Sequence, residues 1–142
     1  MFRGEHKHTI DAKGRLIIPS DYRELLGEKF VLTKGFEGCL SIYPMTEWEA
    51  FEKKLSALPL TNKNARTLTR FFVAGATECE LDKQGRILIP STLREFAGLE
   101  KNVMLAGQLG RIDIWDEEKW WTICAADMNA IADGMEDVDI II

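Results

Sequence analysis

The sequence predicts a mixed α+β fold, mainly β, in which one pattern of elements occurs twice. The decamer DAKGRLIIPS at 11–20 returns as DKQGRILIPS at 82–91, so the second copy follows the first at an offset of 71 residues. After one extra residue, the stretch 31–48 aligns with 103–120 at an offset of 72. A match kept over this length indicates an internal duplication, and two copies are too few for a solenoid. We therefore expect two pseudo-symmetric halves.

Each copy is predicted to begin with a strand, a tight turn and a second strand. The stretches EHKHTI at 5–10 and ATECEL at 76–81 have the character of short strands, and an Asp-x-x-Gly sequence follows each of them. Gly14 and Gly85 can adopt the positive φ that closes a tight hairpin. The next segments, RLII and RILI, are apolar and partly β-branched, as buried strands are, and a proline ends each of them.

A short helix and two further strands follow in each copy. Ser20 and Ser91 are placed to cap a two-turn helix, which ends at Gly27 in the first copy and at Gly98 in the second. Two strands joined by a glycine-bearing turn are then expected over 30–33 and 39–43, and over 102–106 and 111–115.

A longer helix closes each copy. Thr46 and Glu49 have the spacing of a capping box, and Asp116 is placed to cap the corresponding helix of the second copy. A connecting helix is expected between the copies, with Ala65, Leu68, Phe71 and Phe72 facing inward and Lys63, Arg66 and Arg70 facing outward. The chain accordingly divides into a first half at 1–60, the connecting helix at 61–76 and a second half with a C-terminal helix at 77–142.

Composition and charge limit the possible classes of protein. With 46% hydrophobic and 29% charged residues, the chain is predicted to be folded, and no apolar run approaches the roughly 18–20 residues of a membrane span. No signal peptide is recognisable, and the three cysteines form no C-x-x-C pair, which predicts a cytoplasmic protein with reduced thiols. The net charge of −5 is uneven: residues 116–142 carry −7 and the first 115 residues +2. A basic surface away from the C-terminal end is therefore allowed.

The motifs of common enzymes are missing from the sequence. No G-x-S-x-G, P-loop or G-x-G-x-x-G sequence occurs. The only histidines, His6 and His8, form an H-x-H pair with no third metal ligand in view. We therefore expect no enzymatic activity, no cofactor and no metal site.

The repeated Asp-x-x-Gly-Arg stretch gives each predicted turn a defined chemistry. An aspartate that enters a tight turn can accept hydrogen bonds from the backbone N–H groups of the turn. The arginine four residues later can return to that carboxylate with its planar guanidinium group. The same structural corner is thus expected twice, from the structural motif Asp11, Gly14, Asp82 and Gly85.

Basic side chains gather at the same turns. Lysines at a projecting turn tip, with an arginine behind them, are typical of surfaces that meet phosphate groups. The candidate DNA-binding residues are Lys13, Arg15, Lys83 and Arg86, with Arg3 and Lys7 adding positive charge near the first turn.

The doubled motif resembles the MraZ family of bacterial transcriptional regulators. The resemblance rests on the pairs Asp11/Arg15 and Asp82/Arg86, on MFRGEHKHTIDAKGRLIIPS at the start, and on NARTLTRFFVAGATECELDKQGRILIP at 64–90. It extends from residue 1 to about residue 125 and implies two halves similar to AbrB/SpoVT swapped-hairpin β-barrels, with flanking helices. It further implies a nucleoid-associated, ring-like homo-oligomer that binds repeated elements in the promoter of the division and cell-wall gene cluster. By position, the resemblance makes Arg15 the leading contact with double-stranded DNA.

A second interpretation is kept beside this one. Swapped-hairpin barrels also serve as antitoxin-like dimers, and large aromatic residues often mark interfaces. Trp48, Trp120 and Trp121 could contact a protein partner, in which case the chain would be an oligomeric interaction module without specific DNA readout. The basic turn tips favour the regulator, because a module that binds only protein has no need of them.

Overall fold

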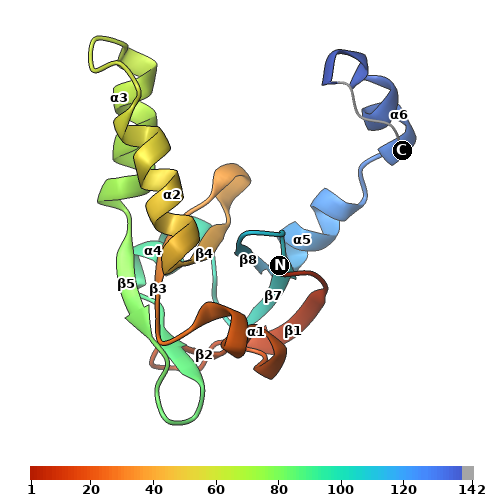
Figure 1. Ribbon diagram of the computed structural model, residues 1–142. Helices are drawn as coiled ribbons and strands as arrows, with labels where there is room; N and C mark the ends of the chain where they lie inside the picture. Colours follow the sequence, from red (N-terminus) through yellow and green to blue (C-terminus); the bar gives the residue numbers. More distant parts are fainter. Residues whose placement is uncertain (139–142) are drawn as a thin grey trace.

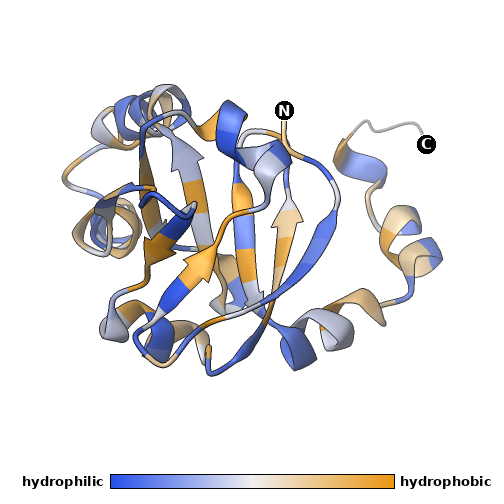
Figure 2. Cartoon of the chain, turned by 90° about the horizontal axis from the view of Figure 1, so that it is seen from below, coloured by the Kyte–Doolittle hydropathy of each residue, from blue (hydrophilic) through white to orange (hydrophobic). Residues whose placement is uncertain are grey.

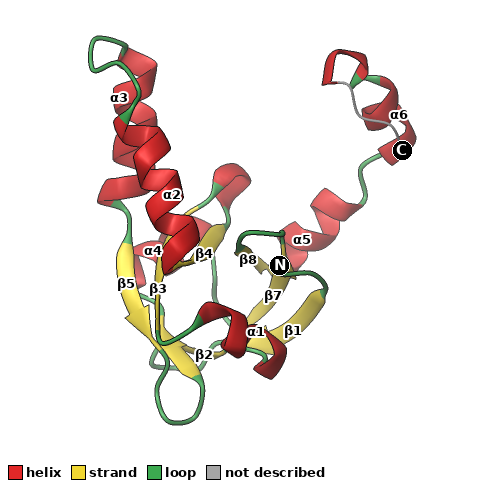
Figure 3. Cartoon of the chain, viewed as in Figure 1, coloured by secondary structure: helices red, strands yellow, loops and turns green. Residues whose placement is uncertain are grey.

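The computed structural model describes residues 1–138, and its elements follow the expected order (Figures 1 and 3). The strands are β1 Glu5–Thr9, β2 Arg15–Ile17, β3 Lys29–Lys34, β4 Leu40–Pro44, β5 Thr77–Glu80, β6 Arg86–Leu88, β7 Asn102–Gly107 and β8 Ile112–Asp116. The helices are α1 Ser20–Leu26, α2 Met45–Ser56, α3 Lys63–Thr69, α4 Ser91–Ala97, α5 Glu117–Cys124 and α6 Met128–Asp133. Single turns η1 Phe36–Gly38 and η3 Glu136–Val138 and a π-helical stretch η2 Arg70–Ala74 complete the list.

The strands exchange partners between the two copies. Six of them form one antiparallel sheet in the order β1-β7-β8-β4-β3-β5, and β2 pairs with β6 in a separate two-stranded ribbon. The first strand of each copy therefore pairs with the other copy: β1 with β7 and β5 with β3. The expected closed barrel is not present among the described residues, because β1 and β5 lie at opposite edges of the sheet and the ribbon is linked to β1 only by the isolated bridge of Ile10 and Leu16. The fold is mixed and mainly β, as predicted.

Two strand pairings place residues opposite their own counterparts in the duplication. Leu16 lies opposite Ile87 in the ribbon, and Ser41 lies opposite Asp113 between β4 and β8. A pseudo-twofold axis therefore passes through both pairs. The Ser41 hydroxyl donates a hydrogen bond of 2.7 Å to the buried Asp113 carboxylate, and Arg111 Nε donates to the same oxygen at 2.9 Å. The buried charge at the axis is thus paired and hydrogen-bonded, as burial requires.

One core joins the two copies. The residues of β2 and β6 alternate, so that Leu16 and Ile87 face inward and their neighbours face out. Figure 2 shows hydrophobic segments along the central strands and hydrophilic stretches on the surrounding loops and helices. The side chains that face the ribbon form the larger of two buried clusters, which includes Leu16, Ile18, Leu32, Ile42, Ile87, Ile89, Leu105 and Ile114.

The strand pairing corrects the alignment of the two copies. The sequence comparison placed Val31 on Val103, whereas the structure equates Phe30 with Val103, since Phe30 pairs with Pro44 and Val103 with the matched residue Asp116. The hairpin that follows is one residue shorter in the second copy, which restores the offset of 72 at β4 and β8. A shift of one residue exchanges the two faces of a strand. The correspondence between β3 and β7 therefore follows from their pairing with β4 and β8, and not from identical residues in the two copies.

Three expected helix caps differ from the structure. The helices at Ser20 and Ser91 begin directly after the prolines, which occupy the N-cap position, so neither serine side chain caps its helix. Pro44 likewise occupies the N-cap position of α2, so the capping box of Thr46 and Glu49 does not form. The cap at Asp116 is confirmed, because its carboxylate accepts a hydrogen bond from the Lys119 backbone N–H at 3.2 Å. Gly27 and Gly98 end their helices as expected.

The connecting helix is present but changes its pitch. It runs as α3 and then as the π-helix η2, which turns the following residues relative to a regular α-helix. Phe72 is buried as expected, whereas Leu68 is 36% exposed, so its predicted inward position is wrong. The buried Thr33 hydroxyl donates a 2.6 Å hydrogen bond to the Phe72 carbonyl in the π-helical stretch. Between residues 1 and 138, no helix combines the length and apolar character needed to cross a bilayer.

Candidate nucleic-acid interface

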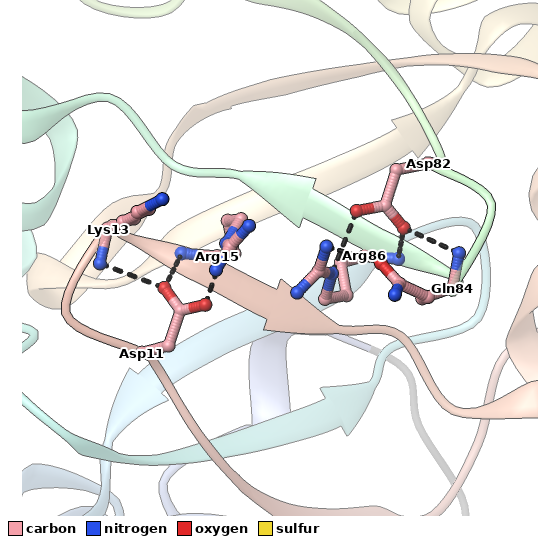
Figure 4. A network of polar contacts seen from close by, with 6 residues as sticks. All are labelled: Asp11, Lys13, Arg15, Asp82, Gln84 and Arg86. Atoms are coloured by element: carbon pink, nitrogen blue, oxygen red, sulfur yellow. Dashed lines mark hydrogen bonds and ion pairs between the residues drawn. The ribbon is translucent and has the colours of Figure 1, made fainter.

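The first turn of the ribbon is held by a single carboxylate (Figure 4). One oxygen of Asp11 accepts hydrogen bonds from the backbone N–H groups of Lys13 at 3.0 Å and Arg15 at 2.9 Å. The other oxygen accepts from Arg15 Nε at 2.7 Å, which is both an ion pair and a hydrogen bond. Gly14 takes the positive φ of +84° that closes the turn. This confirms the expected return of the arginine to the aspartate.

The second turn repeats this arrangement. Asp82 accepts from the backbone N–H groups of Gln84 at 2.9 Å and Arg86 at 2.8 Å, and from Arg86 Nε at 2.8 Å. Gln84 adds one contact that the first turn lacks, because its side-chain oxygen accepts from Arg86 Nη2. Gly85 has a φ of +75°. Figure 4 shows the two turns at opposite ends of the paired strands β2 and β6.

The two aspartates are structural anions. The pKa of Asp11 lies below its usual value, chiefly because the Arg15 backbone N–H stabilises the ionised form. The pKa of Asp82 is lowered in the same way by the Arg86 backbone N–H. Both carboxylates are therefore ionised at neutral pH, where they hold the turn and orient the arginine.

The outward side of the ribbon combines arginines with apolar side chains. We call the outward residues Arg15, Ile17, Arg86 and Leu88 the ribbon face. Arg15 lies opposite Leu88, and Ile17 lies opposite Arg86, so the two arginines are related by the pseudo-twofold axis. Ile17 is 44% and Leu88 60% exposed. Within the described part of the chain, the two terminal nitrogens of Arg15 have no hydrogen-bond partner, so they are available to an acceptor outside the chain.

Two further arginines pack against the turns and were missed from the sequence. Arg23 on α1 donates from Nε to the Ile18 carbonyl at 2.7 Å, and its guanidinium group lies against Gly85 of the other copy. Arg94 on α4 donates from Nε to the Ile89 carbonyl at 3.0 Å, and its guanidinium group lies against Gly14. Each copy thus supports the turn of the other. The available signal was the repeated arginine in PSDYRELLG and PSTLREFAG, at 19–27 and 90–98.

The structure does not bring Arg3 and Lys7 to the ribbon. Lys7 Nζ lies 3.2 Å from Glu117 Oε1 and 5.7 Å from the centre of the Trp121 ring, so it faces α5. Arg3 precedes β1, at the end opposite the 11–14 turn, and its backbone carbonyl accepts a hydrogen bond from the Tyr22 hydroxyl at 2.9 Å. The expected basic cluster around the first turn is therefore smaller than the sequence suggested: Lys13 and Arg15, with Arg94 behind them.

The histidine and tryptophan residues were candidates for a metal site and for a protein interface. His6 Nε2 lies 3.4 Å from Asp21 Oδ2 and its ring packs edge-on against Tyr22 at 4.9 Å. Trp48 and Trp120 are buried, whereas Trp121 is exposed. Residues 1–138 contain no group of three His, Cys, Asp or Glu side chains close enough to hold a metal ion.

A two-stranded ribbon with outward arginines is one kind of element that can contact a DNA duplex. The major groove of B-DNA is about 12 Å wide and admits a two-stranded β-ribbon. Arginine side chains can make paired hydrogen bonds to guanine edges or phosphates, and lysines at the turn tips can meet the phosphate backbone. The ribbon face presents two such arginines, and the turns present Lys13 and Lys83.

Comparison with known proteins identifies the family of the chain. The model of the family described as "MraZ protein, putative antitoxin-like" matches residues 1–71 and 72–139, one match for each copy. A protein of Halothermothrix orenii named "Transcriptional regulator MraZ" is 53% identical over 99% of this chain and 100% of its own length. Proteins of the same name from Clostridium acetobutylicum and Thermoanaerobacter sp. are 51% identical over 99% and 100%, and 60% identical over 84% of both chains. These relatives are named as regulators and not as enzymes, in agreement with the expectation that the chain has no enzymatic activity. The chain belongs to the MraZ family.

Proposed function

We propose that the chain is a sequence-specific DNA-binding transcriptional regulator of the division and cell-wall gene cluster promoter, acting on the chromosome in the cytoplasm. The observation that carries the proposal is the pair of Asp–Arg turns at the two ends of an exposed ribbon. The names of the relatives support the regulatory part. The proposal goes beyond those names in assigning the surface that meets DNA and the promoter that is bound.

The proposed contacts follow from the hydrogen bonds of the turns. Arg15 enters the groove with both terminal nitrogens and Arg86 with the one that Gln84 does not bind, while Lys13 and Lys83 neutralise phosphates on either side. Asp11 and Asp82 fix the Nε edge of each arginine before DNA arrives, which lowers the entropy that binding must overcome. Arg23 and Arg94 hold the turns and add positive charge behind them. Arg3 and Lys7 lie outside this interface.

We further propose that the architecture is a variant of the AbrB/SpoVT swapped-hairpin barrel, with halves at 1–60 and 77–142 and a connecting helix at 61–76. The exchange of β1 and β5 between the copies supports this assignment. In such a variant the internal duplication does within one chain what two chains do in a dimer, and the ribbon forms only when both copies are present.

Self-association is part of the proposal. One ribbon offers few phosphate contacts, and the chain as a whole is acidic, so a single copy is expected to bind weakly. A ring-like homo-oligomer that places one ribbon on each of several promoter repeats makes the later contacts intramolecular, with avidity gains on the order of 10²–10⁴. This explains how an acidic chain would occupy a promoter.

A salt titration tests the proposed function. Binding of the wild-type chain to a fluorescein-labelled duplex carrying the promoter repeats would be measured by anisotropy between low and physiological salt, with a scrambled duplex as control. We expect a steep salt dependence and a preference for the promoter that survives at physiological salt. Equal binding to both duplexes would contradict specific readout and favour the antitoxin-like or interaction-module function, for which Trp121 offers an exposed aromatic side chain.

A further inference from the structure

An apolar groove lies between the end of α2 and the following helix. It encloses about 440 Å³ and is lined by aliphatic side chains with arginines on one side: Leu55, Leu58, Leu60, Val73, Arg66 and Arg70. Leu60 is 84% and Val73 39% exposed. We call this surface the α2/α3 groove. Aliphatic side chains that line a concave surface at such exposure leave apolar area to be covered by a partner.

The charged residues that line the groove are all basic. They are Arg66 and Arg70, and no acidic side chain of the described residues lines it. Arg66 donates to the Leu60 carbonyl at 2.9 Å, which holds this guanidinium group beside the exposed apolar loop. A partner for the α2/α3 groove is therefore expected to be amphipathic and acidic.

The C-terminal segment of the chain has that character. Met128, Ile131, Met135 and Val138 are apolar residues spaced three, four and three apart: the first two lie on α6, Met135 lies in the turn after it, and Val138 lies in η3. Met128 is 57% and Val138 61% exposed, and neither α6 nor η3 buries a residue.

The same segment carries the complementary charge. Residues 124–138 contain four acidic side chains and no basic one: Asp127, Asp133, Glu136 and Asp137. Asp127 caps α6 by accepting from the backbone N–H groups of Asn129 at 3.1 Å and Ala130 at 3.2 Å. The segment is thus folded while Met128, Ile131 and Val138 stay exposed.

The two surfaces lie on different sides of the molecule. Figure 1 shows α2 and α3 on one side of the sheet and α5 and α6 on the other, and Figure 2 shows the same separation from below. We propose that the α6–η3 segment of one copy docks in the α2/α3 groove of the next copy. Such a contact uses two different surfaces, so it repeats head to tail and generates a ring where the rotation closes. The inference rests on the proposed self-association and names the contact that produces it.

Disulfide trapping between separately prepared chains tests the contact. In a Cys124→Ser background, a Val73→Cys chain would be mixed with an Ile131→Cys chain and oxidised. Cys39 and Cys79 are buried, and burial raises their pKa values to about 12 and about 11, so they stay unreactive. We expect a covalent dimer of the two different chains. The matched control mixes Ile131→Cys with Glu24→Cys, which places an exposed cysteine on α1, outside the groove.

Charge reversal tests the complementarity. Arg66→Glu with Arg70→Glu should weaken association on the order of tenfold, as read from native mass spectra across a dilution series. Asp133→Lys with Glu136→Lys in the same chain should restore it, because each groove would then meet a basic segment.

The trapping and mass measurements distinguish the proposed contact from its alternatives. Trapping no greater than in the control, while native mass spectra still show oligomers, would overturn this contact and leave the proposed ring standing. A wild-type chain that remains monomeric would overturn the proposed self-association itself. Cross-linking within a single chain that carries both cysteines, at a dilution where no dimer forms, would show that the groove receives the chain's own segment.

Discussion

Gly85→Ala tests the support of one copy's turn by the other copy's arginine. The residue has a φ of +75°, and a left-handed conformation costs a non-glycine residue on the order of 1 kcal/mol. In addition, an added Cβ would overlap the Arg23 guanidinium group, which would have to leave its 2.7 Å hydrogen bond to the Ile18 carbonyl. The net loss of one such partly buried hydrogen bond is about 1 kcal/mol. We expect the free energy of unfolding to fall by about 2 kcal/mol in total.

Gly14→Ala is the matched control, because it lies at the equivalent position of the first turn. Its φ of +84° carries the same conformational strain, but an added Cβ would lie 2.9 Å from Arg94 Cζ, which a small movement of that flexible side chain relieves. We expect a loss of about 1 kcal/mol there, from the backbone strain alone. Urea unfolding at one fixed protein concentration would measure both variants.

A double-mutant cycle completes this test. In an Arg23→Ala background the overlap is gone, so Gly85→Ala should then cost about as much as Gly14→Ala, and the two changes should not be additive. Equal losses for the two glycine variants in the wild-type background would refute the reasoning. So would strict additivity of Arg23→Ala and Gly85→Ala.

Two further predictions concern the turns and the ribbon. Because the folded-state pKa values of Asp11 and Asp82 are lowered, their contribution to stability is complete above the unfolded value of 3.8 and disappears as the pH falls through the folded values. Asp11→Asn with Asp82→Asn should therefore destabilise the chain at pH 7 and reduce its loss of stability between pH 5 and acid, as denaturant unfolding across this pH range would measure; an unchanged acid dependence would contradict it. Leu16→Ala should cost about 2–5 kcal/mol because this fully buried side chain leaves a cavity, whereas Ile17→Ala, on the exposed ribbon face, should change stability by less than about 1 kcal/mol. Similar losses for the two variants in urea unfolding would show that the inward and outward faces of β2 are assigned wrongly.

The parts of the structure that depend on local chemistry could be predicted from the sequence. The Asp–Arg turns form as expected because one carboxylate within a tight turn reaches both the backbone N–H groups and the arginine four residues on. Gly27 and Gly98 end their helices as glycines do, and Asp116 caps α5. These features involve residues close together in the chain, so spacing and residue type were sufficient.

The parts of the structure that depend on pairing between distant strands could not be predicted from the sequence. Leu16 and Ile87 face inward in any arrangement of the two copies, so the alternation of residues does not reveal that β1 pairs with β7. The same is true of the open sheet, which depends on which strands occupy the edges. Arg23 was passed over because its partner, Gly85, lies in the other copy and no spacing connects them.

Some predictions from local sequence patterns were also wrong, because neighbouring residues changed the helix start or the helix pitch. Pro19 and Pro90 end the preceding strand and occupy the N-cap position themselves, which shifts Ser20 and Ser91 into the helix. Leu68 was expected to face inward on a regular α-helix, but the π-helical stretch that starts at Arg70 alters the phase between it and Phe72.

The most direct test of the account is DNA binding by Arg15→Ala, with the size of the assembly measured on the same samples. Anisotropy would give the affinity for the promoter repeats at one fixed salt concentration, and native mass spectrometry would give the mass. Lys53→Ala, on α2, would control for the loss of an exposed cation elsewhere. Loss of a paired arginine contact is worth about 1–3 kcal/mol, so we predict roughly tenfold to hundredfold weaker binding by Arg15→Ala, with unchanged mass and near wild-type binding by Lys53→Ala. An Arg15→Ala chain that assembles normally and binds the promoter with wild-type affinity would contradict the central claim that the ribbon face contacts DNA.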